Sequence, residues 1–146
     1  MIGYRFDKFK STFFSTPAVM KKVKPAARRV LSKFGSFVRQ TSRQSIKNKK
    51  RSVAGQPPAN RTGKLKRFIY FGYDESKNSV IIGPAKLSNT VSDTALISLE
   101  EGGITDVMDP KTKKTGRKFV AARPFMLPAF DKELPKVPGL WRDSIK

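Results

Sequence analysis

Two short segments of the sequence carry residue types that could do chemistry. Glu100 and Glu101 stand side by side ahead of two glycines, and paired carboxylates can serve as a general acid and a general base. Thr62-Gly63-Lys64 resembles a fragment of a phosphate-binding loop, in which backbone N–H groups and a lysine hold phosphate oxygens. The surrounding sequence decides whether either interpretation can hold.

The rest of the chain argues against both. The 146 residues include no His and no Cys, which removes the usual general base near neutral pH and the commonest transition-metal ligands. The segment at Lys64 lacks the glycine spacing, the preceding strand and the following hydroxyl residue of a phosphate loop. We therefore expect no enzyme activity, no catalytic residue, no metal site and no cofactor; Thr62 and Gly63 more simply turn the chain into a strand beginning near Lys66.

Charge is the strongest signal in the composition. The chain has 31 Lys and Arg against 11 Asp and Glu, a net charge of +20, and no acidic residue between Lys8 and Arg67. So many like charges repel one another within the folded chain, and a nearby polyanion would relieve this repulsion. No base-reading motif is present, so contact would be with bulk phosphate charge. We expect these residues to face DNA or an acidic partner: Lys21, Lys22, Arg28, Arg29, Arg39, Arg43, Lys47, Lys49, Lys50 and Arg51. A merely solvated helix face is the alternative.

Hydrophobic periodicity supplies the elements that would position these residues within a single domain, 1–146. Apolar residues recur at intervals of three and four from Val19 onward, which predicts a long amphipathic helix over about 17–50, with its main part at 25–48. Pro25 either kinks this helix or begins its main part. Residues 51–64 form a basic loop rich in Gly and Pro, long enough to suggest a functional loop.

Residues 65–121 are rich in strand signals. Apolar runs at 66–73 and 79–83 flank a polar turn and predict a β-hairpin, and 104–108 with 117–121 predict a second one. The apolar run at 94–99 fits either a helix or a strand. The alternation at positions 2, 4 and 6 suits a short strand.

A short helix over 124–133 and a tail complete the chain at 122–146, with Pro124 in the first helical turn. The order predicts an α+β fold: a long N-terminal amphipathic helix packed on a small, mainly antiparallel β-sheet, with a short C-terminal helix. The expected core between the long and short helices consists of Val30, Leu31, Phe34, Val38, Phe125, Leu127 and Ala129. No stretch is apolar enough to cross a bilayer or to act as a signal peptide, so we expect no membrane partner.

Three short motifs occur in order along the chain: Thr62-Gly63-Lys64-Leu65, Glu101-Gly102-Gly103 and Ala122-Arg123-Pro124-Phe125-Met126-Leu127-Pro128-Ala129. With the preceding helix and proline-containing loop, the chain resembles the small neck or tail-completion proteins of siphophages, the HK-type and lambdoid tail components, over nearly its whole length. Two features depart from that pattern. Glu-Glu-Gly-Gly replaces an acidic residue, an aromatic and glycine, and the tail from Leu134 is longer.

The resemblance implies a structural protein of a tailed-phage or prophage particle, located in the virion and assembled in the host cytoplasm. It implies a homo-oligomeric ring, a hexamer, that joins the head connector to the tail tube and lets double-stranded DNA pass. The expected partners are further copies of the chain and the neighbouring head-connector and tail-tube or tail-terminator proteins. The alternative is a nucleic-acid-binding protein of ribosomal or nucleoid type. The charge supports it equally, but the motif order and the lack of a nucleic-acid-binding signature count against it.

Overall fold

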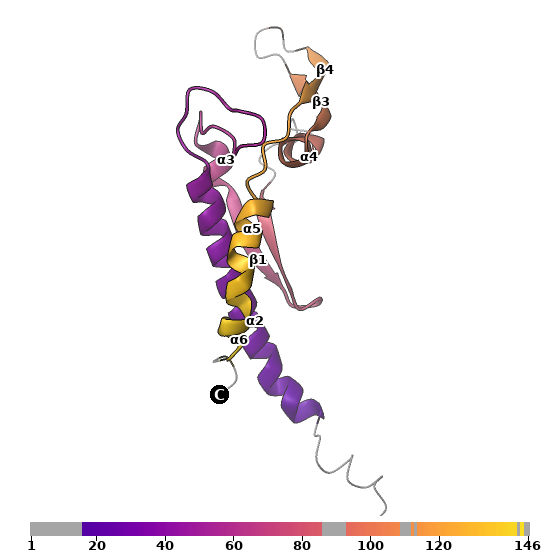
Figure 1. Ribbon diagram of the computed structural model, residues 1–146. Coiled ribbons are helices and arrows are strands. Elements are labelled where there is room, and N and C mark those ends of the chain that lie inside the picture. The colour runs from indigo at the N-terminus through magenta and orange to yellow at the C-terminus, as the bar shows by residue number, and fades with distance from the viewer. Residues whose placement is uncertain (1–15, 86–92, 109–111, 113, 143, 145–146) are drawn as a thin grey trace, which may run out of the picture.

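A long helix with two small β-hairpins and a short C-terminal helix confirms the α+β class (Figure 1). The computed structural model describes residues 16–85, 93–108, 112, 114–142 and 144. The strand expected at residues 2–6 lies outside the described residues. The strands form two separate two-stranded antiparallel sheets, where the sequence suggested one small sheet.

Helix α2 spans Thr16–Ser45 and contains Pro25. The prediction that the helix continues to about 48 or 50 was wrong. In its last turns the Ser42 hydroxyl donates to the Val38 carbonyl at 2.8 Å, and the Ser45 hydroxyl donates to the Ser42 carbonyl at 2.8 Å. Serine side chains that bond to nearby backbone carbonyls compete with helical continuation, and Ile46 leaves the helix to become fully buried.

The first hairpin packs against α2. Its strands are β1 (Ile69–Asp74) and β2 (Ser79–Pro84), paired antiparallel. The expected start near Lys66 was wrong, because 64–67 form a short helix, α3 (Lys64–Arg67), after Gly63 adopts a φ of 74°. A Cβ at Gly35 of α2 would lie 2.8 Å from Val80 and 2.9 Å from the Phe71 ring. The glycine therefore lets the hairpin approach the helix closely.

The second hairpin stands apart from the first. Helix α4 (Asp93–Glu101) resolves the ambiguous run at 94–99 as a helix and leads into β3 (Gly103–Met108), which pairs antiparallel with β4 (Thr115–Val120). The hairpin expected from the sequence is thus confirmed. It lies beside α4, beyond the end of α2 that carries α3, while the tip of the β1–β2 hairpin points the other way (Figure 1).

The C-terminal segment runs along α2 as α5 (Leu127–Glu133), the 3-10 turn η1 (Leu134–Lys136) and α6 (Val137–Arg142) (Figure 1). The predicted helix start at Pro124 was wrong by one turn: α5 begins at Leu127, and Pro128 occupies its first turn. Residues 121–124 remain extended because they pair with other segments, as described below.

Six of the nine buried apolar residues of the described chain form two clusters along the α2 surface. Phe34, Val38 and Ala129 form the first cluster, and Ile46, Ile69 and Phe125 form the second. Phe34 also meets the Phe130 ring edge-to-face at 5.4 Å. Leu31 of the predicted core is half-buried. The prediction that Leu127 belongs to the core was wrong, because its side chain is 60% exposed. The predicted residues that are buried are Val30, Phe34, Val38, Phe125 and Ala129.

Glu133 ties α5 to α2. Its carboxylate accepts a hydrogen bond of 2.7 Å from the Thr41 hydroxyl and forms an ion pair with Lys136. The hydrogen bond from Lys136 is the main cause that lowers the Glu133 pKa, with the Thr41 hydroxyl adding to it against the opposing effect of burial. The folded chain therefore holds this carboxyl deprotonated more strongly than the unfolded chain does.

We predict that protein stability falls as the pH drops below about 4.5, the usual pKa of a glutamic acid, and that Glu133 contributes to this loss. A lowered folded-state pKa stabilises the protein above the unfolded-state pKa, and the contribution disappears as the pH falls through the folded value. Urea unfolding between pH 6 and roughly pH 3 measures the slope, which Glu133→Gln should flatten. Asp131→Asn removes an exposed carboxylate from the same helix and controls for net charge. An unchanged slope in Glu133→Gln would contradict this assignment.

Candidate nucleic-acid interface

The basic residues predicted on α2 lie on the sides of the helix that the core clusters leave open. Lys21, Lys22, Arg28 and Arg29 are exposed, whereas Arg39 and Arg43 are half-buried. Helix α2 has no acidic residue to pair with them. The helix therefore presents a surface of one charge sign over most of its length.

Some of these arginines also contact their own chain. The Arg39 Nε donates to the Ile69 carbonyl at 2.8 Å, and the Arg39 guanidinium lies 5.9 Å from the centre of the Tyr70 ring. Arg29 donates to the Ser144 carbonyl at 3.0 Å, and Arg28 lies 6.0 Å from the centre of the Tyr73 ring. Arg39 thus joins α2 to β1, so its replacement would affect folding as well as charge.

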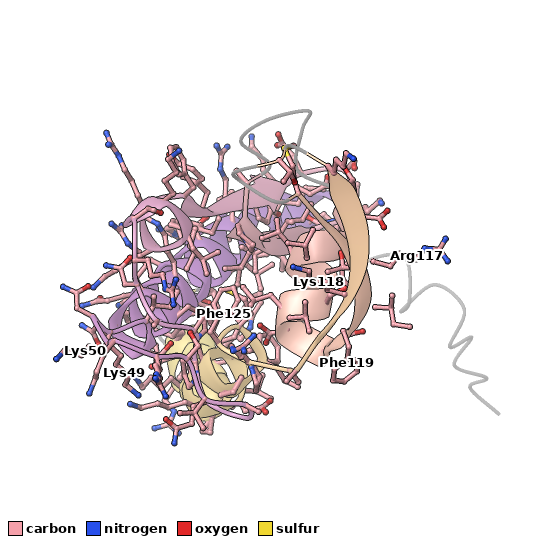
Figure 2. All side chains as sticks on the ribbon, turned by 90° about the horizontal axis from the view of Figure 1, so that it is seen from above. Lys49, Lys50, Arg117, Lys118, Phe119 and Phe125 are labelled. Carbon is pink, nitrogen blue, oxygen red and sulfur yellow. The ribbon has the colours of Figure 1, made fainter. Side chains whose placement is uncertain are left out.

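Four further predicted residues, Lys47, Lys49, Lys50 and Arg51, follow the end of α2 and lie in the loop at 46–63 rather than on a helix. The loop is anchored at two points: the Asn60 N–H donates to the Lys47 carbonyl at 2.9 Å, and the Gly55 N–H donates to the Ala122 carbonyl at 2.8 Å. Figure 2 shows Lys49 and Lys50 at one margin of the molecule and Arg117 at the opposite margin. The loop thus holds its cations at a defined edge.

The three sequence motifs meet in space. Leu65 of the first motif packs against the buried cluster that contains Phe125 of the third. The Arg123 N–H donates to the Leu99 carbonyl at 2.8 Å. Gly102 has a φ of 82°, and a Cβ there would lie 3.0 Å from the Ala122 nitrogen. Conformation and space therefore both require glycine at position 102.

The described structure gives the remaining motif residues local roles. Gly63 and Gly103 adopt positive φ angles of 74° and 129°, which glycine accommodates without strain. Pro128 lies in the first turn of α5, and Ala129 is buried against α2. Thr62 and Glu101 are exposed, and Pro124 is half-buried.

Glu100, which the sequence offered only as a general acid or base, holds the start of α5. Its carboxylate accepts hydrogen bonds from the backbone N–H groups of Phe125, Met126 and Leu127 at 3.0, 3.0 and 2.9 Å. These are groups that a helix N-terminus leaves without partners. The neighbouring Glu101, which belongs to the second sequence motif, is exposed. The N-cap residue of α5 makes no side-chain hydrogen bond to the helix start. This missing cap indicates that a side chain from another element, here Glu100, takes its place.

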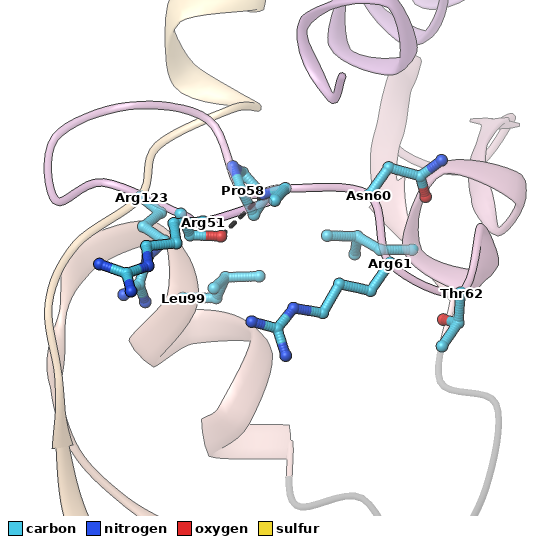
Figure 3. A pocket seen from close by; sticks show the side chains of 10 residues that line it. Arg51, Pro58, Asn60, Arg61, Thr62, Leu99 and Arg123 are labelled. Carbon is cyan, nitrogen blue, oxygen red and sulfur yellow. Dashed lines mark hydrogen bonds between the residues drawn. The ribbon is translucent and has the colours of Figure 1, made fainter. Parts of the chain in front are cut away.

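A pocket of about 510 Å³ lies between the loop, the end of α4 and the third motif (Figure 3). Arg51, Arg61 and Arg123 line it, with Leu99 and Pro58 among the residues between them (Figure 3). The Arg123 Nε is buried and has no hydrogen-bond partner among the described residues. Arg61 was absent from the predicted set, because only the long-range contacts of the loop bring it beside Arg51 and Arg123.

The described part of the chain offers neither a cluster of metal-ligating side chains nor a membrane-spanning helix. Residues 16–85, 93–108, 112, 114–142 and 144 contain no group of three or more His, Cys, Asp or Glu side chains that could hold a metal ion. Within the same residues, no helix has the length and apolar character needed to cross a membrane.

Comparison with known proteins gave no relative: no family model, no curated protein and no solved structure matches this chain.

Proposed function

We propose that the chain is a non-enzymatic structural subunit of a tailed-phage particle, part of a neck or tail-completion ring that joins the head connector to the tail tube and lets DNA pass. The motif resemblance supports the particle, and the basic residues support the passage of DNA. The observation that carries the proposal is the presence of two separate sheet faces with exposed apolar side chains that the described chain leaves uncovered.

The first uncovered face belongs to the β3–β4 hairpin. Thr105 of β3 is buried toward the body, so Ile104 and its partner Phe119 lie on the outer face, where they are 67% and 76% exposed. Met108 is exposed on the same face, together with the charged pair Asp106 and Arg117. Figure 2 shows Arg117 and Phe119 on the side of the hairpin away from α4. A two-stranded hairpin is at best marginally stable alone, so a neighbour on this face would stabilise it.

The second uncovered face belongs to β1–β2. Phe71 and Val80 point toward α2, where they reach Gly35, so Tyr70 and Ile81 lie on the outer face, and Ile81 is 66% exposed. Gly72 pairs with Ile81 and Gly83 pairs with Tyr70. The glycines leave a hollow of about 500 Å³ between these side chains. This face is hollowed and mostly apolar, with Asp74 among its lining residues, whereas the first one carries the large exposed side chains of Ile104 and Phe119.

Two different surfaces that fit each other make a head-to-tail contact, and repeated head-to-tail contacts close into a ring or extend into a filament. We infer that the β3–β4 face of one copy fits the β1–β2 hollow of the next. The choice of a closed hexamer follows from the motif resemblance. The positive charge of each copy is tolerated in a ring through which a polyanion passes, since the DNA relieves the repulsion.

The test is the mass of the assembly. We predict that light scattering or native mass spectrometry finds a closed oligomer, and that Phe119→Ser abolishes it by removing the projecting side chain. Gly72→Leu should have the same effect by filling the hollow from the other side. Val53→Ser, which changes an exposed apolar residue on neither face, is the matched control.

An equimolar mixture of Phe119→Ser and Gly72→Leu distinguishes a head-to-tail contact from a symmetric one. Each mixed pair keeps one intact face of each kind, so the mixture should form dimers and nothing larger. A protein that stays monomeric both alone and with its particle partners would contradict the ring. A monomer that binds any DNA sequence would instead favour the ribosomal or nucleoid alternative.

A further inference from the structure

We infer that the pocket lined by Arg51, Arg61 and Arg123 binds a phosphate group of the DNA backbone. The inference rests on the proposed function in one respect, which is that duplex DNA passes the subunit. The phosphate contact is thereby assigned to this one pocket, whereas the charge pattern of the sequence is compatible with such a contact at any of the basic residues.

The charge arrangement points to an anion. Three arginines line one pocket, and none of the described residues that line it is acidic. Glu100, the carboxylate adjacent in sequence to the pocket residue Leu99, is committed to the backbone N–H groups at the start of α5. Like charges gathered in this way repel each other, and a bound anion removes that repulsion.

The donors suit a phosphate. A guanidinium is a planar fork of N–H groups that matches the oxygens of a phosphate. The Arg123 guanidinium makes one long hydrogen bond, of 3.4 Å to the Ala121 carbonyl, and its Nε has no partner in the described structure, so a small movement of this side chain would bring unsatisfied donors to a bound phosphate. Leu65, Leu99 and Pro58 contribute apolar walls, which strengthen the attraction between ions by lowering the local dielectric constant.

The size and surroundings favour a polymer over a free ion. The volume of about 510 Å³ exceeds that of a single phosphate, so a phosphate can enter while it remains part of a chain. Lys49 and Lys50 lie on the same loop and are exposed. A nucleic acid offers further phosphates at regular spacing and neutralises these lysines at the same time. Free phosphate would leave the lysines uncompensated.

The experiment measures the binding of a non-specific DNA duplex as a function of salt concentration. The test variant is Arg51→Gln with Arg61→Gln, because both side chains are exposed and neither makes a hydrogen bond on which the described fold depends. The control is Lys132→Gln with Arg142→Gln, which removes the same charge from exposed residues that line neither the pocket nor the two uncovered sheet faces. Inorganic phosphate, compared with chloride at equal ionic strength, serves as competitor. The mass of the assembly is measured on every sample.

We expect the test variant to bind all DNA sequences more weakly and to lower the slope of log affinity against log salt by about 1, the value for one lost phosphate contact. The control should keep the wild-type slope. Inorganic phosphate should displace DNA from the wild type better than chloride does, and should lose this advantage in the test variant. Retention of the wild-type mass in the test variant separates this result from the ring proposal, which fails only if the wild type does not assemble.

Three outcomes would overturn the inference. Equal slopes in the test and control variants mean that the pocket holds no phosphate of the duplex. A phosphate advantage that depends on the pocket, with unchanged DNA affinity, identifies the site as one for free phosphate. Loss of assembly in the test variant with unchanged DNA affinity identifies the occupant as a carboxylate of a neighbouring subunit.

Discussion

Replacing Phe125 with alanine is expected to destabilise the protein by about 3–5 kcal/mol, the range for a fully buried phenylalanine. The side chain is 1% exposed and packs against Ile46 and Ile69, with Leu65, Leu99 and Met126 around it. It joins the end of α2, strand β1 and the start of α5. The truncation therefore removes a contact among three elements and leaves a cavity that none of them can readily fill. Urea unfolding of the purified variant gives the change in the free energy of unfolding.

Leu127→Ala is the matched control for Phe125→Ala. It lies two residues further along the same segment, was expected in the core from the sequence, and is 60% exposed. Exposed substitutions usually change stability by less than about 1 kcal/mol. If Leu127→Ala costs as much as Phe125→Ala, the described start of α5 is wrong.

The second large effect is expected at Glu100. Glu100→Ala should cost about 2–4 kcal/mol, because the start of α5 loses its capping carboxylate: loss of a cap costs about 0.5–2 kcal/mol, and one hydrogen bond to a charged group contributes roughly 1.5–3 kcal/mol. Glu100→Gln keeps one acceptor oxygen and should lose less. Amide hydrogen exchange should speed up at Phe125, Met126 and Leu127.

Glu101→Ala is the control for Glu100→Ala, since it removes an exposed carboxylate one residue away. Its effect on stability should be small, and the exchange of the α5 amides should stay as in the wild type. Equal losses for the two variants would mean that net charge, rather than the bond to α5, accounts for the effect. A loss of stability in Glu101→Ala, with none in Glu100→Ala, would contradict the assignment of the α5 contact to Glu100.

Much of the fold follows from local patterns in the sequence. The spacing of apolar residues identified α2, and alternation with polar turns identified both hairpins, because each of these elements is defined by neighbours within a few residues. The errors lie at element ends. The sequence around Ile46 continues the helical spacing, yet Ile46 is drawn into the second core cluster with Ile69 and Phe125, so α2 ends one residue earlier.

The candidate site was less predictable, since it depends on contacts between distant residues. Arg51 and Arg123 were singled out, one for its charge and the other for its motif, but nothing in the sequence joins them to Arg61. The same is true of Glu100 and the backbone at 125–127. Both arrangements arise because the segment at 121–125 passes between the loop and the end of α4. Local periodicity carries no information about such a crossing.

Residues 121–125 also determine the stage of folding at which the arginine pocket can form. Helix α2 depends on contacts close in sequence and can form in about a microsecond. The pocket needs Arg123 to reach Leu99 and Gly55 to reach Ala122, and the second of these closes a loop of more than sixty residues, a step that slows folding. An incomplete chain therefore carries its positive charge from the start but has no pocket. Whatever occupies the pocket can select completed subunits over partly folded ones.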